Sequence, residues 1–337
     1  MKRISLFAML LAAVAGCAAD SVPDQAVAAA AGDDKYIVDE WQVPYEKSRP
    51  RDPFVDSTGR AWFCGQAGAY LAYLEPGTGT FHKYDLADGA GPHNLIVDSD
   101  DQVWFAANTL PYIGRLDPAS GEVEKFPMPD AIRDPHTLVF DSAGDIWFTA
   151  QRSNYIGKLL VATGEVRAFA VPVPSSRPYG IRVDAGDRPW VVLFGSNKLA
   201  TVDPATMQLE VIDLPREEIR PRRLEITADG AIWYGDYATG RLGRFDPETG
   251  SVREWLMPGG SRARPYGTAL DDNGAIWLAE GSSPNRLVRF DPVAEDFTDV
   301  VELPNAQGSV RHMYFHAPSR EIWFGEDSNF IGRVRLN

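Results

Sequence analysis

Seven tryptophans recur at nearly constant spacing along the chain, and this repeat limits its fold more than any other feature. They are separated by 42 to 46 residues: Trp62, Trp104, Trp147, Trp190, Trp233, Trp277 and Trp323. Around each one, short runs of β-branched and aromatic residues alternate with turn signals rich in Asp, Pro and Gly. Four such runs in a unit of about 43 residues predict one blade of a β-propeller.

The two ends of the repeat predict how the ring closes. The last unit ends after its third strand, at residues 331–336, whereas residues 36–44 form an unmatched fourth-strand pattern that resembles residues 252–258. We therefore expect an all-β, seven-bladed propeller over residues 36–337, built from four-stranded blades. Its N-terminal strand should complete the last blade and so remove the open sheet edges. The repeated tryptophans should pack between blades.

The residues before the propeller predict export and a lipid anchor. Lys2 and Arg3 precede an apolar run that is too short to span a membrane, and Val14-Ala15-Gly16-Cys17 fits a bacterial lipobox. We expect a lipoprotein signal peptide over residues 1–16, lipidation at Cys17 and a flexible tether through residue 35. The alternative is an ordinary signal peptide with an incidental Cys. Ala rather than Asp follows Cys17, so a Gram-negative host should sort the protein to the periplasmic face of its outer membrane.

The charge balance argues against one class of partner, nucleic acid, although a local basic patch is still compatible with it. The formal net charge is −14, whereas nucleic-acid binding needs a basic face. Two cysteines, Cys17 and Cys64, cannot form a disulfide framework, and Cys64 should be a small buried hydrophobe. We expect a monomer that contacts the membrane only through its anchor and binds a small molecule or a glycan.

One position at the start of each predicted inner strand carries a restricted set of side chains. It follows the Pro that opens each blade, which Val310 replaces in the last unit, and it lies five residues before the first turn. Only Arg, His and Tyr occur there: Arg51, His93, His136, Tyr179, Arg222, Tyr266 and Arg311. These positions should meet near the propeller axis in a shared binding funnel, although they could merely cap loops. In the irregular last unit, His312 is an alternative to Arg311.

These side chains suggest acid–base chemistry on a bound anion. His93 and His136 occupy the same slot of adjacent blades and could act as base and acid, or as a metal pair. With His312 and Tyr266 they form the predicted catalytic set. The predicted substrate-binding set is Arg51, Tyr179, Arg222 and Arg311, together with the amides Gln66, Asn108 and Gln151.

A second ring should follow each repeated Trp by three or four residues. It contains the three amides in the first three units, Phe194 in the fourth, and acids in the last three: Asp236, Glu280 and Glu326, with Asp327 beside the last. Three carboxylates on adjacent blades predict either a hard-cation site or ion pairs with Arg222, Arg223 and Arg311.

The repeat resembles that of the virginiamycin B lyase (streptogramin lyase) family. The similarity covers essentially all of residues 36–337 and is carried by RPYGIRVD (177–184), GDIWFTAQRSNYIGKL (144–159), RPYGTALDDNGAIWLAE (264–280) and SNFIGRV (328–334). The resemblance implies a seven-bladed propeller. It also implies opening of a cyclic depsipeptide antibiotic at its ester bond by elimination, with Mg²⁺ as the Lewis acid and a histidine moving the proton.

The sequence departs from the family's catalytic pattern at most of its positions. Arg51 replaces a Tyr in the first blade, and Tyr266 replaces a His in the sixth. In the seventh blade Arg311 stands in the His slot, with His312 one residue late. Ser309 and Asp327 stand where the family has Glu.

Three functions therefore remain open from the sequence. The first is an extracytoplasmic lyase or hydrolase acting on a carbonyl- or ester-bearing substrate, with His93 or His136 as the base and arginines binding the oxyanion or a carboxylate. The second is a non-catalytic propeller of the cell envelope that binds an anionic small molecule, a glycan or a protein. The third is a structural scaffold.

Overall fold

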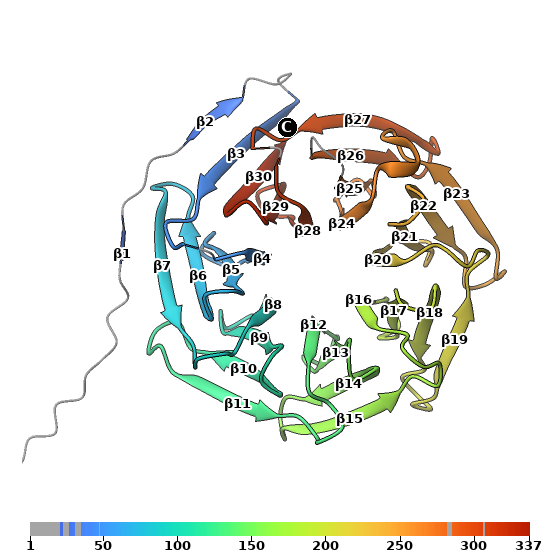
Figure 1. Ribbon diagram of the computed structural model, residues 1–337, viewed down its shortest axis with the longest axis horizontal. Coiled ribbons are helices and arrows are strands. Elements are labelled where there is room, and N and C mark those ends of the chain that lie inside the picture. Colours follow the sequence, from blue (N-terminus) through green and yellow to red (C-terminus); the bar gives the residue numbers. More distant parts are fainter. Residues whose placement is uncertain (1–20, 23–26, 31–34, 47, 282–284, 306) are drawn as a thin grey trace, which may run out of the picture.

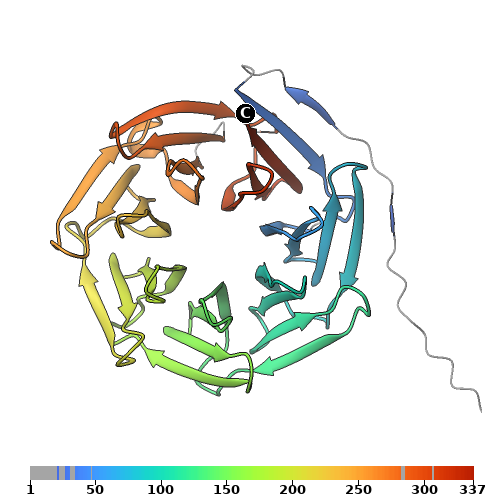
Figure 2. The same cartoon turned by 180° about the vertical axis from the view of Figure 1, so that it is seen from behind.

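The computed structural model describes residues 21–22, 27–30, 35–46, 48–281, 285–305 and 307–337. Seven antiparallel sheets are arranged in a closed ring around a central axis, as Figures 1 and 2 show from the two faces. The predicted all-β, seven-bladed propeller is therefore confirmed. The predicted signal peptide over residues 1–16 and Cys17 lie outside the described residues.

Each blade is a four-stranded meander that runs from the axis outward. The innermost strands are β4 (Pro50–Val55), β8 (Pro92–Val97), β12 (Pro135–Phe140), β16 (Pro178–Val183), β20 (Pro221–Ile226), β24 (Pro265–Leu270) and β28 (Val310–His316). The second strands, which carry the repeated Trp, are β5 (Ala61–Gly65), β9 (Val103–Ala107), β13 (Ile146–Ala150), β17 (Pro189–Leu193), β21 (Ile232–Asp236), β25 (Ile276–Glu280) and β29 (Glu321–Glu326).

The two outer strands of each blade complete the meander. The third strands are β6 (Tyr70–Glu75), β10 (Tyr112–Leu116), β14 (Tyr155–Leu160), β18 (Lys198–Val202), β22 (Arg241–Phe245), β26 (Arg286–Asp291) and β30 (Phe330–Leu336). The fourth strands are β7 (Thr80–Asp85), β11 (Val123–Pro127), β15 (Glu165–Ala170), β19 (Leu209–Asp213), β23 (Val252–Leu256), β27 (Asp296–Glu302) and, for the last blade, β3 (Tyr36–Gln42). A single 3₁₀ turn, η1 (Gly260–Arg262), precedes β24 among the described residues.

The ring closes with a strand from the N-terminal part of the chain. β3 pairs antiparallel with β30 over its whole length, from Tyr36 opposite Leu336 to Gln42 opposite Phe330 (Figure 1). The predicted closure is therefore confirmed. Within the segment expected to be a tether, the backbones of β1 (Ser21–Val22) and β2 (Val27–Ala30) pair with β7 and β3. No helix of the described residues is long and apolar enough to cross a membrane.

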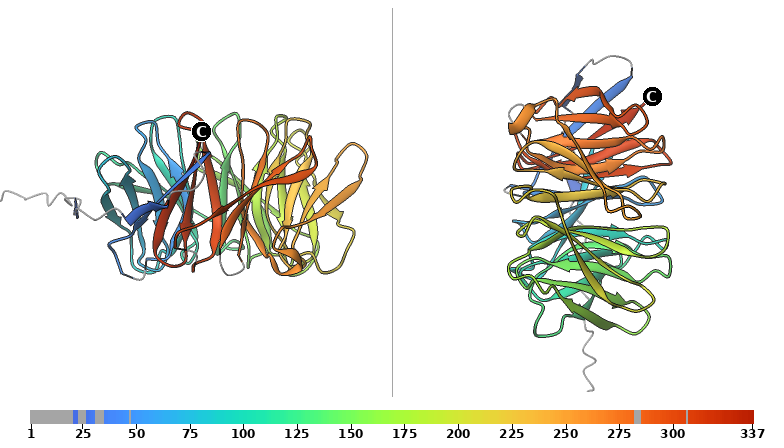
Figure 3. Two further views of the ribbon diagram at one scale, coloured as in Figure 1. Left: turned by 90° about the horizontal axis from the view of Figure 1, so that it is seen from above. Right: turned by 90° about the vertical axis from the view of Figure 1, so that its right-hand side faces the viewer.

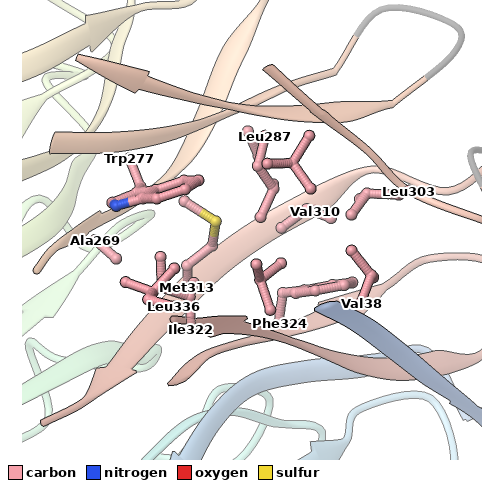
Figure 4. Close-up of a cluster of buried hydrophobic side chains, with 13 residues drawn as sticks. Val38, Ala269, Trp277, Leu287, Leu303, Val310, Met313, Ile322, Phe324 and Leu336 are labelled. Atoms are coloured by element: carbon pink, nitrogen blue, oxygen red, sulfur yellow. The ribbon is translucent and has the colours of Figure 1, made fainter. Parts of the chain in front are cut away.

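The hydrophobic core lies between neighbouring blades. Figure 4 shows one such interface, where Trp277 of the sixth blade packs with Met313 and Phe324 of the seventh and with Val38 of β3. All seven repeated tryptophans are buried, with exposures of 5% or less. Six donate their indole N–H to an oxygen of the same blade; Trp62, for example, bonds Asp56 at 2.7 Å. Aromatic burial between blades therefore fixes the repeat, as predicted.

Each innermost strand contains an irregularity near its start that shapes the axis. In β12, Pro135 pairs with Ala150 and Leu138 with Phe148, so two residues of β12 stand opposite one residue of β13. The other six inner strands show an equivalent register shift. The strands run between the two faces of the disc, which Figure 3 shows edge-on. Because a bulge re-aims side chains, two consecutive residues of each inner strand can approach the axis.

Candidate functional site

The seven side chains of the predicted first ring come together where the inner strands begin. We call this end of the channel the mouth. Five of the seven are no more than 4% exposed, and Arg222 and Arg311 are half-buried. The mouth is therefore tightly packed by its own side chains: Arg51, His93, His136, Tyr179, Arg222, Tyr266 and Arg311.

The two predicted catalytic histidines lie against each other. The rings of His93 and His136 have centroids 3.6 Å apart, and His136 also contacts the Tyr179 ring at 4.3 Å. Burial lowers the pKa of both imidazoles well below the usual range, and nearby arginines, Arg51 and Arg223, lower it further. Both histidines are therefore neutral near pH 7. A neutral imidazole can accept a proton, and the catalytic role of these two histidines stays a prediction.

Two tyrosines of the mouth, from the fourth and sixth blades, share a hydrogen bond. The hydroxyls of Tyr179 and Tyr266 lie 2.6 Å apart, and Arg311 donates to the Tyr266 hydroxyl at 3.3 Å. Burial raises the pKa of Tyr179 to about 12. Burial also raises the pKa of Tyr266, but the charges of Arg222, Arg51 and Arg311 outweigh it and leave that pKa below its ordinary value. Tyr266 is therefore the more acidic phenol of the pair.

Three arginines converge on one aromatic ring at the rim of the mouth. The guanidinium carbons of Arg222, Arg177 and Arg220 lie 4.3, 5.6 and 5.8 Å from the centroid of the Phe194 ring. Arg177 and Arg220 each directly precede a blade-opening Pro and have positive φ angles of 52° and 53°. The residue before the blade-opening Pro has a similar positive φ angle in the first, second and sixth blades, so this backbone conformation belongs to the repeat. Among the described residues, no carboxylate lies within 4.0 Å of these three guanidinium groups.

A rim cavity of about 600 Å³ opens beside this arginine cluster. Arg177, Arg220 and Phe194 line it, together with Asn197, Glu217 and Glu218. Arg222 is also held over the rings of Tyr237 at 4.5 Å and Tyr266 at 4.9 Å. The open space at this end therefore lies over the fourth and fifth blades, and its wall carries Phe194, two arginines and two glutamates.

A second layer of axial side chains closes the channel beneath the mouth. Arg223 of β20 crosses the axis to Asp52 of β4 at 3.0 Å and to the Thr137 hydroxyl of β12 at 3.2 Å. Asn94 of β8 donates to Asp52 at 3.0 Å and accepts from the backbone N–H of Leu138 at 2.8 Å. Asp52, Asn94, Thr137 and Arg223 are each 2% exposed or less. We call these four residues the plug.

The plug depends on a glycine in the fourth blade. A Cβ at Gly180 would lie 2.9 Å from the Cα of Arg223 and 2.8 Å from the carbonyl oxygen of Arg222. Gly180 therefore leaves the space in which Arg223 crosses the channel. Asp52, Asn94 and Thr137 were not predicted from the sequence. The available signal was that each directly follows a first-ring residue, at the position that the bulge turns toward the axis.

The ambiguity in the last blade is resolved in favour of Arg311. Arg311 faces the mouth, where it binds Asp327 through two nitrogens at 2.6 and 2.8 Å. His312 lies below it, among the residues that line a cavity at the other end of the channel. Placing His312 with the catalytic set at the mouth was therefore wrong, because consecutive positions of the bulged strand belong to different layers.

Two of the predicted amides at the mouth bind neighbouring protein groups. Gln66 accepts a hydrogen bond from Arg51 at 3.2 Å, and Asn108 donates to the carbonyl of Pro135 at 3.1 Å. Gln151 is half-buried at the same position of the third blade. Gln66 thus orients one nitrogen of Arg51, while the Nε and Nη2 atoms of Arg51 are buried without a hydrogen-bond partner. Binding of a substrate by the amides remains a prediction.

The predicted trio of acids does not form a metal site. Asp236 binds Arg216 at 2.5 Å, Glu280 binds Arg286 at 2.6 Å, and Glu326 accepts from Ser328 at 2.7 Å. Nowhere in the described part of the chain do three His, Cys, Asp or Glu residues gather to hold a metal ion. Of the predicted ion pairs, only one to Arg311 forms, with Asp327, because Asp236 and Glu280 pair with Arg216 and Arg286 instead. These residues do not fit a Mg²⁺ centre.

These acids were assigned to the mouth because the second ring was placed one residue too early in the last three blades. Side chains of a strand alternate between its faces, so positions three and four after the Trp point in opposite directions. The fourth position reaches the mouth in the last three blades as in the first four. There it holds Tyr237, which contacts Arg222, and Asp327, which pairs with Arg311. The acids at the third position point away from the mouth, toward the outer parts of the blades.

Glu326 instead meets another carboxylate, that of Glu40 on β3. Glu40 is 5% exposed and Glu326 is fully buried, and the Oε1 atom of each has no hydrogen-bond partner. Burial and the charge of Glu40 raise the pKa of Glu326 to about 8, and burial raises the pKa of Glu40 to about 7. The two carboxylates connect the closing strand β3 to β29.

Comparison with known proteins supports the fold. No known family model and no curated protein sequence matches the chain. Virginiamycin B lyase from Staphylococcus aureus superposes with a TM-score of 0.81 and 20% identity, over 90% of this chain and 100% of that one. A streptogramin B lyase gives 0.81 and 23%, over 90% and 98%. The extracellular domain of a protein described as a hybrid two-component system from B. thetaiotaomicron gives 0.67 and 17%, over 92% and 46%. The chain thus has the fold of virginiamycin B lyase.

Proposed function

We propose that the mouth binds an anionic small molecule, in a protein anchored outside the cytoplasm by a lipid on Cys17. The observation that carries the binding proposal is the convergence of Arg177, Arg220 and Arg222 on the Phe194 ring with no carboxylate within 4.0 Å in the described residues. Like charges that gather without a counter-ion favour an anionic ligand. Guanidinium groups bind carboxylates and phosphates in bidentate geometry, and Phe194 offers an apolar face.

The wider charge distribution supports the same proposal. The whole chain carries a formal net charge of −14, whereas the mouth collects arginines from four blades. Arg51 lies deeper, 4% exposed, with two guanidinium nitrogens that have no hydrogen-bond partner, although its Nε atom lies 3.6 Å from the Asp52 carboxylate. A ligand carboxylate that reached Arg51 would satisfy these donors. Leaving a buried donor unsatisfied costs about 1–3 kcal/mol, which a bound anion would recover.

Calorimetric titration with citrate, succinate, galacturonate and uncharged glycerol tests this function. We expect saturable binding of at least one of the anions, weakened by added salt, and none of glycerol. Arg177→Gln and Arg220→Gln should each weaken the binding about tenfold, as expected for loss of a hydrogen bond to a charged group. Arg188→Gln is the matched control, because Arg188 pairs with Asp203 away from the mouth. The absence of anion binding, or equal affinities in all three variants, would refute the proposal.

A second candidate function is proton transfer on the bound anion, as in a lyase. The observation that favours it is the placement of Tyr266, whose pKa is lowered by three arginines and whose ring centroid lies 4.9 Å from the guanidinium carbon of Arg222. Neutral His136 contacts the partner phenol of Tyr179 at 4.3 Å. Tyr266→Phe and His136→Gln should then abolish turnover of an ester-bearing anion without loss of its binding. Turnover at the wild-type rate in both variants would leave binding alone as the function.

The proposed anchor is tested separately. Wild-type protein expressed in a Gram-negative host should incorporate labelled palmitate and sediment with the outer membrane. Cys17→Ala should remain unlabelled. Labelling of that variant would contradict the proposed lipidation site.

A further inference from the structure

The propeller channel has a second open space at the end opposite the mouth. This lower cavity has a volume of about 350 Å³, within the range of small-ligand pockets. Its residues come from the inner strands and lie at or beyond the plug positions, toward the end where those strands finish. The plug residues Asp52, Asn94, Thr137 and Arg223, bonded across the axis, separate it from the mouth. It is therefore distinct from the anion site proposed above.

The wall of the lower cavity is mainly apolar. Leu95, Leu138 and Met313 lie near the plug and are almost completely buried. Phe140 and Tyr314 are only partly buried, although they line the same space. Half-exposed aromatic rings around a concave surface gain free energy when a ligand covers them, at about 25 cal/mol per Å² of apolar area removed from water.

The charged groups of the lower cavity are already compensated. Arg182 binds both carboxylate oxygens of Glu225, at 2.9 and 3.0 Å, and the Thr268 hydroxyl donates to Glu225 at 2.7 Å. This contrasts with the mouth, where three guanidinium groups lack a carboxylate partner. A charged ligand would lose its hydration in the lower cavity without gaining a free counter-charge.

One polar side chain in the lower cavity has no partner. His312 is 7% exposed, its Nδ1 atom is buried without a hydrogen-bond partner, and its Nε2 atom, which is not among the buried atoms, makes no hydrogen bond with any other described residue, so Nε2 is the atom that a ligand can reach. Buried polar groups are rarely left unbonded, and those that are require an explanation. Burial lowers the pKa of His312 well below its usual range, so this imidazole is neutral and can accept or donate one hydrogen bond.

We propose that the lower cavity is a second binding site, for an uncharged and mainly apolar small molecule with one hydrogen-bonding group that reaches the imidazole of His312. The apolar wall supplies affinity, the compensated Arg182–Glu225 pair excludes ions, and His312 selects a ligand with a hydroxyl or a similar group. The site is independent of anion binding at the mouth.

Calorimetric titration of the full-length protein with 1-hexanol, 1-heptanol and 1-octanol tests this site. We expect saturable binding that strengthens about fourfold for each CH₂ group, and binding of octanoate at least tenfold weaker than that of 1-octanol. Ala269→Leu, which fills the cavity from its wall, should weaken 1-octanol binding at least tenfold. The triple variant Arg177→Gln/Arg220→Gln/Arg222→Gln should leave it unchanged, which separates this site from the mouth.

His312→Phe tests the polar part of the proposal. The variant should reduce the affinity for 1-octanol about fivefold or more, as expected for one lost hydrogen bond. If His312→Phe fails to fold, Ala269→Leu still tests the site. Failure of the folded wild type to bind alkanols saturably, or unchanged binding in Ala269→Leu, would overturn the proposal, as would loss of binding in the arginine variant. Unchanged binding in folded His312→Phe would overturn the assignment of His312.

Discussion

Two buried carboxylate sites in this propeller have opposite electrostatics. Asp52 in the plug is 1% exposed, and the charge of Arg223 helps to hold its pKa well below the usual range despite burial. Glu326 in the last blade is equally buried, and burial together with the charge of Glu40 raises its pKa to about 8. Burial raises the pKa at both sites, so the degree of burial does not explain why they differ. The sign of the nearest charge makes the difference.

The two sites also have different structural consequences. The plug is an ionised network that connects blades one, two, three and five across the axis. The Glu40–Glu326 pair lies at the ring closure, where two carboxylates can coexist in the interior only if at least one is protonated. The plug should therefore hold at any ordinary pH, whereas the ring closure should weaken as pH rises.

The largest expected effect comes from breaking the plug. Asp52→Asn leaves the charge of Arg223 buried and uncompensated, and we expect a loss of about 3–5 kcal/mol in the free energy of unfolding. Urea unfolding at pH 7 measures it. The double variant Asp52→Asn/Arg223→Met should recover much of the loss, because it removes both charges. A loss below about 1 kcal/mol in Asp52→Asn would mean that the plug is not an important ionic network.

The ring closure should give an intermediate effect with a distinct pH dependence. Both carboxyls have folded-state pKa values, about 7 and about 8, above that of an unfolded Glu. The folded protein therefore binds more protons than the unfolded chain between about pH 4.5 and pH 8, and stability falls as pH rises through this window. We expect a fall of at least about 1.4 kcal/mol, the equivalent of one pKa unit.

Glu326→Gln is the variant that isolates this effect. It should unfold with a weaker pH dependence than the wild type between pH 5 and 8, and it should be the more stable of the two at pH 8. Glu40→Gln is the matched variant from the partner strand and should behave alike. Parallel pH profiles of wild type and both variants would show that these carboxyls titrate normally.

The smallest effect is expected for an ion pair at the mouth that water still reaches. Arg311 and Asp327 are bonded through two nitrogens, but their side chains are 27% and 25% exposed. Solvent screening limits such a pair, so Asp327→Asn should lower the free energy of unfolding by about 1 kcal/mol or less. Thermal unfolding at low and high salt measures it, and salt should reduce the difference. If Asp327→Asn lowered the free energy of unfolding as much as Asp52→Asn does, burial would not determine what it costs to break an ion pair.

Most of the fold could be predicted from the repeat in the sequence. The spacing of the tryptophans, the missing fourth strand of the last unit and the unmatched pattern before Pro44 predicted the blade number and the closure by β3, both confirmed. These features are local and periodic, so they can be read without knowing any long-range contact. The same alignment correctly brought seven polar side chains together at the mouth, from Arg51 to Arg311.

The candidate site was predicted less completely, and the misses share one physical cause. A side chain's direction depends on single-residue register, and the acids after Trp233, Trp277 and Trp323 were assigned to the mouth although they stand one residue too early. The bulge in β28 likewise directs Arg311 to the mouth and His312 to the layer below it. Neither a strand's register nor a bulge leaves a strong signal in one sequence, because both depend on pairing with the neighbouring strand.

The sequence by itself thus determined the architecture and the chemical character of the mouth, because a periodic pattern of buried aromatics and turn residues permits few arrangements other than a closed ring of blades. Only the tertiary structure decided which charges meet. It paired Arg223 with Asp52, 171 positions apart in the chain, and Glu326 with Glu40 across the closure. It also left Arg177, Arg220 and Arg222 without a carboxylate partner among the described residues. Electrostatic interactions act through space at a few ångströms, and sequence distance carries no information about them.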